Sequence, residues 1–294
     1  MGICEGRVVI ITGAGGGLGA AHARVFGQEG AKVVVNDINA EAAQAVADEI
    51  IAAGGEAIVN TSDITNYDDS LNAVKQAIET FGDLHVVVNN AGVNRDRMFA
   101  SMTEAEWDTI MAVHLKGHFC ISSHAVHYWR AQAKQGNLPN ARIINTTSGA
   151  GLQGSIGQSN YAAAKAGIAA LTLNQAAELA RYGVTANAVA PAARTGMTTA
   201  VEEMATRMAI PEDGSFDYFA PENVSSLLVW LGSEASSSIT GRVFEAEGGF
   251  ICIADGWRKT EGVDKGARWQ PAEIGDAMQQ LLAKEEPAQK VYGT

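Results

Sequence analysis

Short, β-branched runs alternate with longer, alanine-rich runs over most of this chain, and this alternation constrains the fold more than any other feature. Strands separated by helices of this length pair in parallel, because the chain must cross back over the sheet between them. The expected strands are 7–12, 32–36, 57–60, 84–88, 142–147, 184–190 and 241–246. The expected helices run from residue 19 to near 30, over 40–53 and 67–81, from 103 to about 131, from 161 onward, and over 223–231.

This pattern predicts an α/β fold with one doubly wound, mostly parallel sheet of seven strands and helices on both faces. Ligands of such sheets bind at the C-terminal ends of the strands. The chain has 294 residues, 47% of them hydrophobic, and no break in composition divides it, so one large core is expected.

A glycine cluster follows the first expected strand directly. It reads as G-x-G-x-x-A through Gly15, Gly17 and Ala20, or as T-G-x-x-x-G-x-G through Thr12, Gly13, Gly17 and Gly19. Glycines let a backbone approach a pyrophosphate, and a helix N-terminus offers free N–H groups to it. A tight turn is the alternative, since a glycine cluster alone is a weak signal.

An acidic residue, Asp37, follows the second expected strand. A carboxylate at this distance from the glycines reaches the ribose hydroxyls of NAD and repels the 2′-phosphate of NADP. Gly16 and Ile38 stand where NADP enzymes of this type tend to hold a basic residue, which favours NAD. The alternative role for Asp37 is the N-cap of the helix expected from Ala40.

Two further turns lie at the same predicted edge of the sheet. Asp63, in the Ser-Asp-Ile-Thr turn, could accept a hydrogen bond from an adenine amino group, and the small Ala91–Gly92 pair permits close approach of a cofactor. Asn and Gly are also ordinary turn residues, so this second motif is only moderately specific.

Tyr161 and Lys165 lie four residues apart in a run of alanines that predicts a helix, so both project from one face. A phenol with its ordinary pKa of about 10 is a poor base near neutral pH, and a fixed ammonium stabilises its phenolate. Ser148 follows an expected buried strand and would emerge at the same edge of the sheet. The three groups are predicted to converge on one oxygen. Chance spacing of Tyr and Lys on a helix is the alternative.

The balance of charge excludes several partners. A net charge of −12 argues against nucleic acid and anionic membranes. The chain has no run of 18 apolar residues, and its first residues lack a signal-peptide pattern, so a cytoplasmic location and no membrane partner are expected.

Cysteine and histidine patterns give no metal or disulfide prediction. Cys4, Cys120 and Cys252 are far apart and form no CxxC pair. The pairs His114 with His118 and His124 with His127 have helical spacing but lack a third ligand nearby. No metal site is expected.

Taken together, these motifs resemble the short-chain dehydrogenase/reductase family over about residues 6–255. The matching pieces are TGAGGGLG at 12–19, Asp37, Asp63, NNAG at 89–92, Ser148, YAAAK at 161–165, Pro191 and Thr195. The resemblance implies a Rossmann fold, a nicotinamide cofactor, and hydride transfer between a secondary alcohol and a ketone.

Site roles carry over by position. The resemblance implies that Tyr161 is the general acid/base, that Ser148 bonds the reacting oxygen, and that Lys165 holds the nicotinamide ribose and assists Tyr161. The expected cofactor-binding residues are Gly13, Gly15, Gly17, Leu18, Gly19, Asp37, Asp63, Ile64, Asn90, Ala91, Gly92, Tyr161, Lys165, Pro191 and Thr195.

Two departures from the family pattern stand out. His114 replaces an Asn that helps hold a water next to the lysine, and it could serve that water, relay protons itself, or merely pack beside the site. Ala192 replaces the usual glycine after Pro191. Both features resemble the 3-hydroxyacyl-CoA and 17β-hydroxysteroid dehydrogenase-like subgroup, which includes the dehydrogenase part of peroxisomal multifunctional enzyme type 2.

The resemblance implies a catalytic domain over 1–256. Within it, the segment at about 195–221 is interpreted as a lid whose Met, Ile and Phe residues could form an apolar wall over a ligand, the alternative being that the methionines only fill the core. The extension 257–294 carries a helical apolar stripe at Ile274, Met278 and Leu281 or Leu282, which we expect to cover the lid or a neighbouring subunit. A homo-oligomer, dimer or tetramer, is expected from the family alone.

The expected function is NAD-dependent oxidation or reduction of a bulky apolar alcohol or ketone, such as a 3-hydroxyacyl thioester or a steroid. A reductase of 3-oxoacyl carrier protein is one alternative, but Asp37 and the acidic balance speak against it. A dinucleotide-sensing binding protein without turnover is another, although a sensor needs no Ser–Tyr–Lys set.

Overall fold

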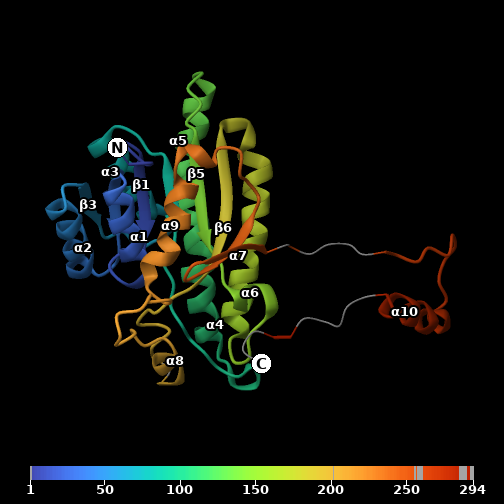
Figure 1. Cartoon of the computed structure of the whole chain (residues 1–294). Helices are drawn as coiled ribbons and strands as arrows, with labels where there is room; N and C mark the ends of the chain where they lie inside the picture. Colours follow the sequence, from blue (N-terminus) through green and yellow to red (C-terminus); the bar gives the residue numbers. More distant parts are fainter. Residues whose placement is uncertain (1, 201, 255, 257–260, 285–289, 292–294) are drawn as a thin grey trace.

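One sheet runs through the whole protein. The computed structural model describes residues 2–200, 202–254, 256, 261–284 and 290–291. The sheet has eight strands in the order β3-β2-β1-β4-β5-β6-β7-β8 (Figure 1). The strands are β1 (Val8–Thr12), β2 (Lys32–Asn36), β3 (Glu56–Asn60), β4 (Val86–Asn89), β5 (Ala141–Thr146), β6 (Val184–Ala192), β7 (Val243–Glu247) and β8 (Phe250–Ala254).

The predicted parallel arrangement is confirmed from β3 to β7, where every neighbouring pair is parallel. All five residues of β1 are buried, as expected for a strand covered on both faces. The order reverses at β1, which lies between β2 and β4, so the crevice beside β1 is where a ligand of such a sheet binds.

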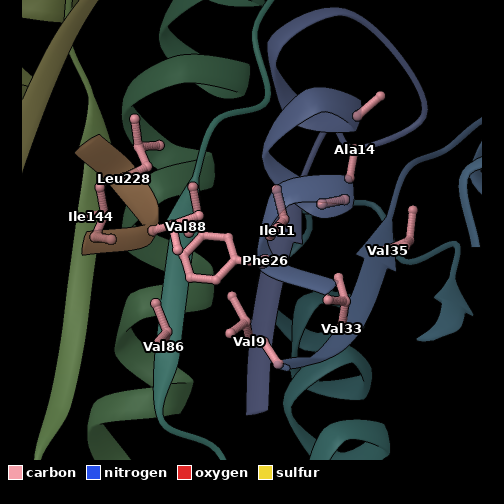
Figure 2. Packing of buried hydrophobic residues seen from close by; sticks show 14 of the residues in the cluster. Val9, Ile11, Ala14, Phe26, Val33, Val35, Val86, Val88, Ile144 and Leu228 are labelled. Atoms are coloured by element: carbon pink, nitrogen blue, oxygen red, sulfur yellow. The ribbon is translucent and has the colours of Figure 1, made fainter. Parts of the chain in front are cut away.

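Helices cover both faces. One core cluster joins the sheet to α1 (Gly17–Gln28), α2 (Ala40–Ala52) and α9 (Pro221–Gly232), and the other joins it to α3 (Tyr67–Phe81), α5 (Gly117–Lys134) and α7 (Ser159–Leu179). Figure 2 shows Phe26 of α1 against the valines of the central strands. A Cβ at Gly232 of α9 would lie 2.6 Å from the Phe26 ring, so this glycine lets the helix pack closely.

The prediction of one helix from 103 to about 131 is wrong in its middle. The structure has α4 (Glu104–Ile110), a π-helical stretch η2 (Met111–Lys116) and then α5. A capping box of Thr103 and Glu106 begins α4. A π-helical turn accommodates an extra residue within a helix and occurs frequently at functional sites. This one carries His114.

The prediction of seven strands is also incomplete, because β8 pairs antiparallel to β7 and forms the edge of the sheet. Gly248, with φ +52°, and Gly249 form the two-residue connection between these strands. The feature of the sequence that could have predicted this hairpin is the Gly-Gly pair between two apolar runs. On β8, Phe250, Ile251 and Ile253 are each more than half exposed.

The remaining elements are short. They are η1 (Phe99–Ser101), α6 (Gly149–Gln153), η3 (Ala180–Tyr182), α8 (Glu202–Arg207), η4 (Glu234–Ser236), η5 (Pro271–Glu273) and α10 (Ile274–Leu282). In Figure 1, α4, α6 and α8 lie at the lower end of the sheet, where the parallel strands end. Within the described residues, no helix is long and apolar enough to cross a membrane.

Candidate active site

A cavity of about 340 Å³ opens at the C-terminal ends of the central strands. Eleven of the residues singled out in the sequence line it: Gly13, Gly17, Leu18, Asp37, Asn90, Gly92, His114, Tyr161, Lys165, Pro191 and Thr195. Six others do not: Gly15, Gly19, Asp63, Ile64, Ala91 and Ser148. Lining residues that were not singled out as cofactor or catalytic candidates are Gly16, Thr146, Thr147, Ala193, Gly196, Met197 and Thr198.

The glycine turn after β1 is shaped by its close neighbours. Gly13 has φ +64°, and a Cβ there would lie 2.7 Å from the Ala91 backbone. A Cβ on Gly19 would lie 2.2 Å from the carbonyl oxygen of Gly13. These two glycines, including the non-lining Gly19, therefore let the turn fold tightly against α1, whose N-terminus faces the cavity through Gly17. Free N–H groups and the helix dipole favour an anionic group there.

Asp37 holds the backbone of the same turn through hydrogen bonds. Its carboxylate accepts one hydrogen bond from the Gly15 N–H and one from the Asn39 N–H, each at 2.9 Å. Gly15 thus holds the aspartate instead of lining the cavity. The alternative that Asp37 caps the next helix is wrong, because Asn39 is the N-cap of α2 and accepts from the Ala42 N–H. Asp37 is left facing the cavity.

Thr12 connects the segment after β4 to the glycine turn through hydrogen bonds. The Thr12 hydroxyl accepts from the N–H groups of Asn90 and Ala91, and the Asn90 side chain donates to the Thr12 carbonyl at 3.0 Å. Ala91 therefore supports the cavity from behind, whereas Asn90 and Gly92 face it.

Tyr161 and Lys165 come from adjacent turns of α7 and both line the cavity. The Lys165 Nζ lies 5.6 Å from the Tyr161 ring centroid and donates to the Thr146 carbonyl at 2.6 Å. Only 2% of the lysine is exposed, and this burial lowers its pKa from 10.5 to about 7. A lysine side chain with such a pKa interconverts between ammonium and amine near neutral pH.

His114 of the π-helical stretch packs edge-on against the Tyr161 ring at 5.1 Å. Its Nε2 lies 2.8 Å from the carbonyl oxygen and 3.1 Å from the nitrogen of Val93. Burial, with a smaller effect of Lys165, lowers the pKa of His114 to about 3. The imidazole is therefore neutral, and a relay that depends on its titration near neutral pH does not fit this environment.

Ser148 does not line the cavity, because its hydroxyl oxygen caps α6 by accepting from the Ala150 N–H at 3.2 Å. The O–H remains a separate donor. A Cβ at Gly151 would lie 2.6 Å from the Lys165 Cβ, so α6 rests directly on α7. The short helix after β5 was not predicted; a serine followed by Gly-Ala-Gly gave little helical signal.

Asp63 and Ile64 serve the turn that contains them. The Asp63 carboxylate accepts from both the N–H and the hydroxyl of Thr65, at 2.8 Å each. Ile64 is buried and packs on Gly117 at the start of α5. Neither reaches the cavity, and their part in cofactor binding stays a prediction.

Beyond Pro191 the wall of the cavity is made by residues 193 and 195–198. Arg194 pairs with Asp217 and also donates to the Met208 carbonyl at 2.8 Å, which ties the two ends of the predicted lid together. Of the apolar wall predicted there, Met197 lines the cavity, Met208 is buried, and Ile210 and Phe216 are mostly exposed. The described part of the lid excludes residue 201.

No group of three His, Cys, Asp or Glu side chains arranged to hold a metal occurs in the described part of the chain. The residues present do fit a dinucleotide. A Cβ on Gly13, Gly15 or Gly19 would lie within 3 Å of a neighbouring atom, the helix N-terminus faces the cavity, and a carboxylate lies at the end of the second strand.

This fold and this cavity define an α/β oxidoreductase that uses a nicotinamide dinucleotide. The model of the family described as short chain dehydrogenase matches residues 7–206, and the chain belongs to this family. The predicted family is thus confirmed, and with it an oxidoreductase that acts on CH–OH groups.

Several individual proteins are similar to this chain over most of its length. The hydroxyacyl-CoA dehydrogenase ChsB1 of Mycobacterium tuberculosis is 41% identical, over 99% of this chain and 93% of that protein. The peroxisomal multifunctional enzyme type 2 of Mus musculus is 38% identical over 91% of this chain, which spans only 35% of that longer protein. A crystal structure of a short chain dehydrogenase from Mycobacterium avium superposes with a TM-score of 0.90, at 53% identity and complete coverage of both chains.

Proposed function

We propose that this protein is an NAD-dependent dehydrogenase that oxidises or reduces a bulky apolar substrate at a secondary alcohol or ketone. A 3-hydroxyacyl-CoA is the favoured substrate, and a hydroxysteroid is the second candidate. The single observation that carries the proposal is the cavity in which Tyr161 and the buried Lys165 share a wall with the glycine turn and Asp37. The similarity to ChsB1 supports the acyl-CoA class.

In this proposal the protein residues handle the proton, and the bound nicotinamide supplies or accepts the hydride. Tyr161 takes the proton from the substrate hydroxyl during oxidation and returns it during reduction. Lys165 stabilises the phenolate from the adjacent helical turn. The O–H of Ser148 orients the reacting oxygen, and the neutral ring of His114 positions the Tyr161 ring through their edge-on contact.

A substrate panel tests this function. The purified protein is incubated with NAD and, separately, with 3-hydroxyacyl-CoAs of increasing chain length, hydroxysteroids and simple secondary alcohols, while NADH absorbance is followed. Turnover with the acyl-CoAs and little with the simple alcohols is expected. Absence of turnover with every alcohol and, in reverse, with every ketone contradicts the proposal.

Cofactor choice is expected to depend on Asp37. Replacement by alanine should weaken NAD binding about tenfold, because hydrogen bonds to a charged acceptor are lost, and should strengthen NADP binding because the repulsion disappears. The dissociation constants for both nucleotides, measured by fluorescence titration, check this. Glu41→Ala, which removes an acidic side chain from the first turn of α2, is the control and should change neither constant. Unchanged constants in Asp37→Ala would remove this residue from nucleotide selection.

The reading as a reductase of 3-oxoacyl carrier protein is less favoured, because that enzyme class requires NADPH and Asp37 faces the cavity. The cytoplasm remains the proposed location, and Cys4 and Cys120 are buried free thiols, as a reducing compartment allows.

We also propose a homo-oligomer in which the C-terminal extension packs on a second copy of the chain. Helix α10 stands off the body in Figure 1 and makes its main contacts with η5. Its Ile274, Met278 and Leu282 are 37%, 44% and 72% exposed. Two nearby lysines, Lys265 and Lys284, are paired with glutamates, so an apolar surface is the partner that this helix fits.

Two observations favour a second copy as that partner. The extension follows β8 in the chain, and β8 itself exposes apolar side chains along the sheet edge, so two copies offer each other both surfaces. At its other end the chain returns to the body, where Val291 lies 3.7 Å from a Cβ placed on Gly154, just after α6. The extension thus follows the exposed edge strand in the chain, and near its other end Val291 lies beside Gly154 on the body.

Removal of residues 257–294 is expected to reduce the oligomer size and to lower activity on bulky substrates. Light scattering and the panel above measure both. In the untruncated chain, Met278→Asp should weaken the oligomer, whereas Gln279→Asp on the neighbouring position should not. A truncated protein of unchanged size and activity would refute this assignment.

A further inference from the structure

A second histidine, His118, lies behind the candidate active site. It belongs to the first turn of α5, four residues after His114, and none of it is exposed. Neither ring nitrogen has a hydrogen-bond partner of normal geometry among the described residues. A neutral imidazole carries one donor and one acceptor, and buried polar groups of this kind are normally satisfied by the protein or by ordered water.

The surroundings of His118 come from three elements. The charged or titratable groups that act on its ring are Lys165 of α7 and His114 of η2, and the backbone carbonyl groups of His114 and Thr146 approach the ring and, with a smaller effect, favour its protonated form. Burial first, and then these two side chains, lower the pKa of His118 far below its ordinary value. No carboxylate opposes them, so the ring is neutral and acts as a hydrogen-bonding group.

Lys165 connects to the same place through Thr146. The Thr146 carbonyl that faces the histidine also accepts the hydrogen bond from Lys165 Nζ at 2.6 Å. An ammonium has three hydrogens, and within the described residues Lys165 forms no ion pair. It therefore needs acceptors beyond this one carbonyl.

Other buried polar side chains lie further along α5 and on the neighbouring strands. Ser122, one turn further along α5, accepts from the Asn89 side chain, which also donates to Asn145. Among the residues that the structure describes, the Asn89 side-chain oxygen is buried without a partner, like the nitrogens of His118. Polar surroundings of this kind hold buried water, whereas an apolar gap of the same size stays dry.

We propose that His118 is a positioning residue for Lys165: its neutral ring holds an ordered water against the ammonium, which gives the ammonium a second fixed acceptor beside the Thr146 carbonyl. The inference rests on the proposed function, because it concerns the group that assists Tyr161. It adds a residue that does not line the cavity and touches no substrate. The proposed role of His118 involves hydrogen bonds only, and no covalent bond is made or broken.

The expected effect follows from the loss of an acceptor. An apolar side chain at position 118 removes the water, so the ammonium form of Lys165 loses stabilisation relative to the amine. Its pKa then falls further below about 7. At neutral pH fewer molecules then carry the ammonium that stabilises the Tyr161 phenolate. Because the phenolate forms less readily, the acid limb of the pH profile for alcohol oxidation moves to higher pH. A shift of about one pH unit corresponds to about 1.4 kcal/mol, near the value of one hydrogen bond to a charged group.

The test compares His118→Leu with His118→Gln, which keeps a donor and an acceptor. The matched control is His22→Leu, since His22 is equally buried but bonds Ser225 on the other face of the sheet. In the nucleotide-free protein, acetylation of Lys165 by acetic anhydride is followed against pH by mass spectrometry. The pH of half-labelling should fall by about one unit in His118→Leu and stay unchanged in His118→Gln and His22→Leu.

The pH profile of kcat/KM is the second readout, and KM for the alcohol should change little. An unchanged labelling curve in His118→Leu, or an equal shift in His22→Leu, overturns the proposal. Labelling needs no turnover, so a shifted curve in a protein that oxidises none of the substrates upholds the role of His118 and contradicts only the proposed function. If the leucine variant fails to fold, His118→Asn, whose shorter side chain withdraws from the ammonium, should shift the curve in the same direction.

Discussion

Replacement of Tyr161 by phenylalanine should lower kcat about 10³-fold, within the range that one general acid/base contributes. The phenylalanine ring keeps the edge-on contact with His114, which lies 5.1 Å away, and only the hydroxyl is lost. KM and the dissociation constant for NAD should therefore stay within about a factor of two, since a group that acts on the proton in the transition state affects kcat and not ground-state binding.

The control for this variant is Tyr182→Phe. Tyr182 belongs to η3, just before β6 begins, and therefore lies at the opposite end of the sheet from the cavity. Steady-state kinetics and thermal melting of both variants separate lost chemistry from lost structure. A Tyr161→Phe protein that retains a tenth or more of its activity would show that another group moves the proton.

Replacement of Lys165 by methionine is expected to inactivate the enzyme and, at the same time, to stabilise the fold. The activity falls because the phenolate of Tyr161 loses its ammonium, a loss of about 10²-fold or more. The stability rises because the folded state bears the cost of a buried charge. Burial lowers the pKa of Lys165 to about 7, against 10.5 ordinarily, which corresponds to roughly 3–5 kcal/mol.

This gain in stability should depend on pH in a defined direction. Below pH 7 both the folded and the unfolded chain carry the proton, so the unmodified protein bears the whole cost. Between about 7 and 10.5 the unfolded chain binds a proton that the folded protein does not, and the free energy of unfolding of the unmodified protein rises with pH. The advantage of Lys165→Met should thus be full at pH 6 and lost near pH 10.

Denaturant unfolding of the nucleotide-free proteins at several pH values measures this difference. Lys134→Met, which removes an exposed lysine at the end of α5, is the control and should show no such trend. If the gain in free energy of unfolding in Lys165→Met were equal at pH 6 and pH 10, burial would not lower the pKa of Lys165.

The alternation of strands and helices was sufficient to predict the sheet, because both signals are local and strong. The strand 32–36 and the helix 67–81 were predicted with the bounds that the structure has. The strand β8 was missed because its short apolar run follows a Gly-Gly turn within a segment assigned to the end of the domain. The π-helical stretch was missed because nothing in the run of 111–116 distinguishes it from an α-helix.

Positions in the site were predictable where a motif fixes them. Tyr161, Lys165 and Asp37 meet at one cavity because each follows from spacing on a helix or from the end of a parallel strand. Contacts that depend on tertiary packing were not predictable. Gly15 supports Asp37, Ser148 caps a helix, and Thr146 receives the lysine, and none of these follows from residue type and spacing alone.

The contact between Gly151 and Lys165 has a consequence for how substrate range can change in evolution. Because α6 leaves no room even for a methyl group at Gly151 against α7, the helix that bears the tyrosine and the lysine is packed closely on this side. Changes in selectivity are then expected on the other wall of the cavity, among residues 195–200 and 202–221, where most side chains are at least partly exposed and where loops generally tolerate sequence change. Descendants of this protein should therefore diversify in that segment while the reacting geometry stays frozen.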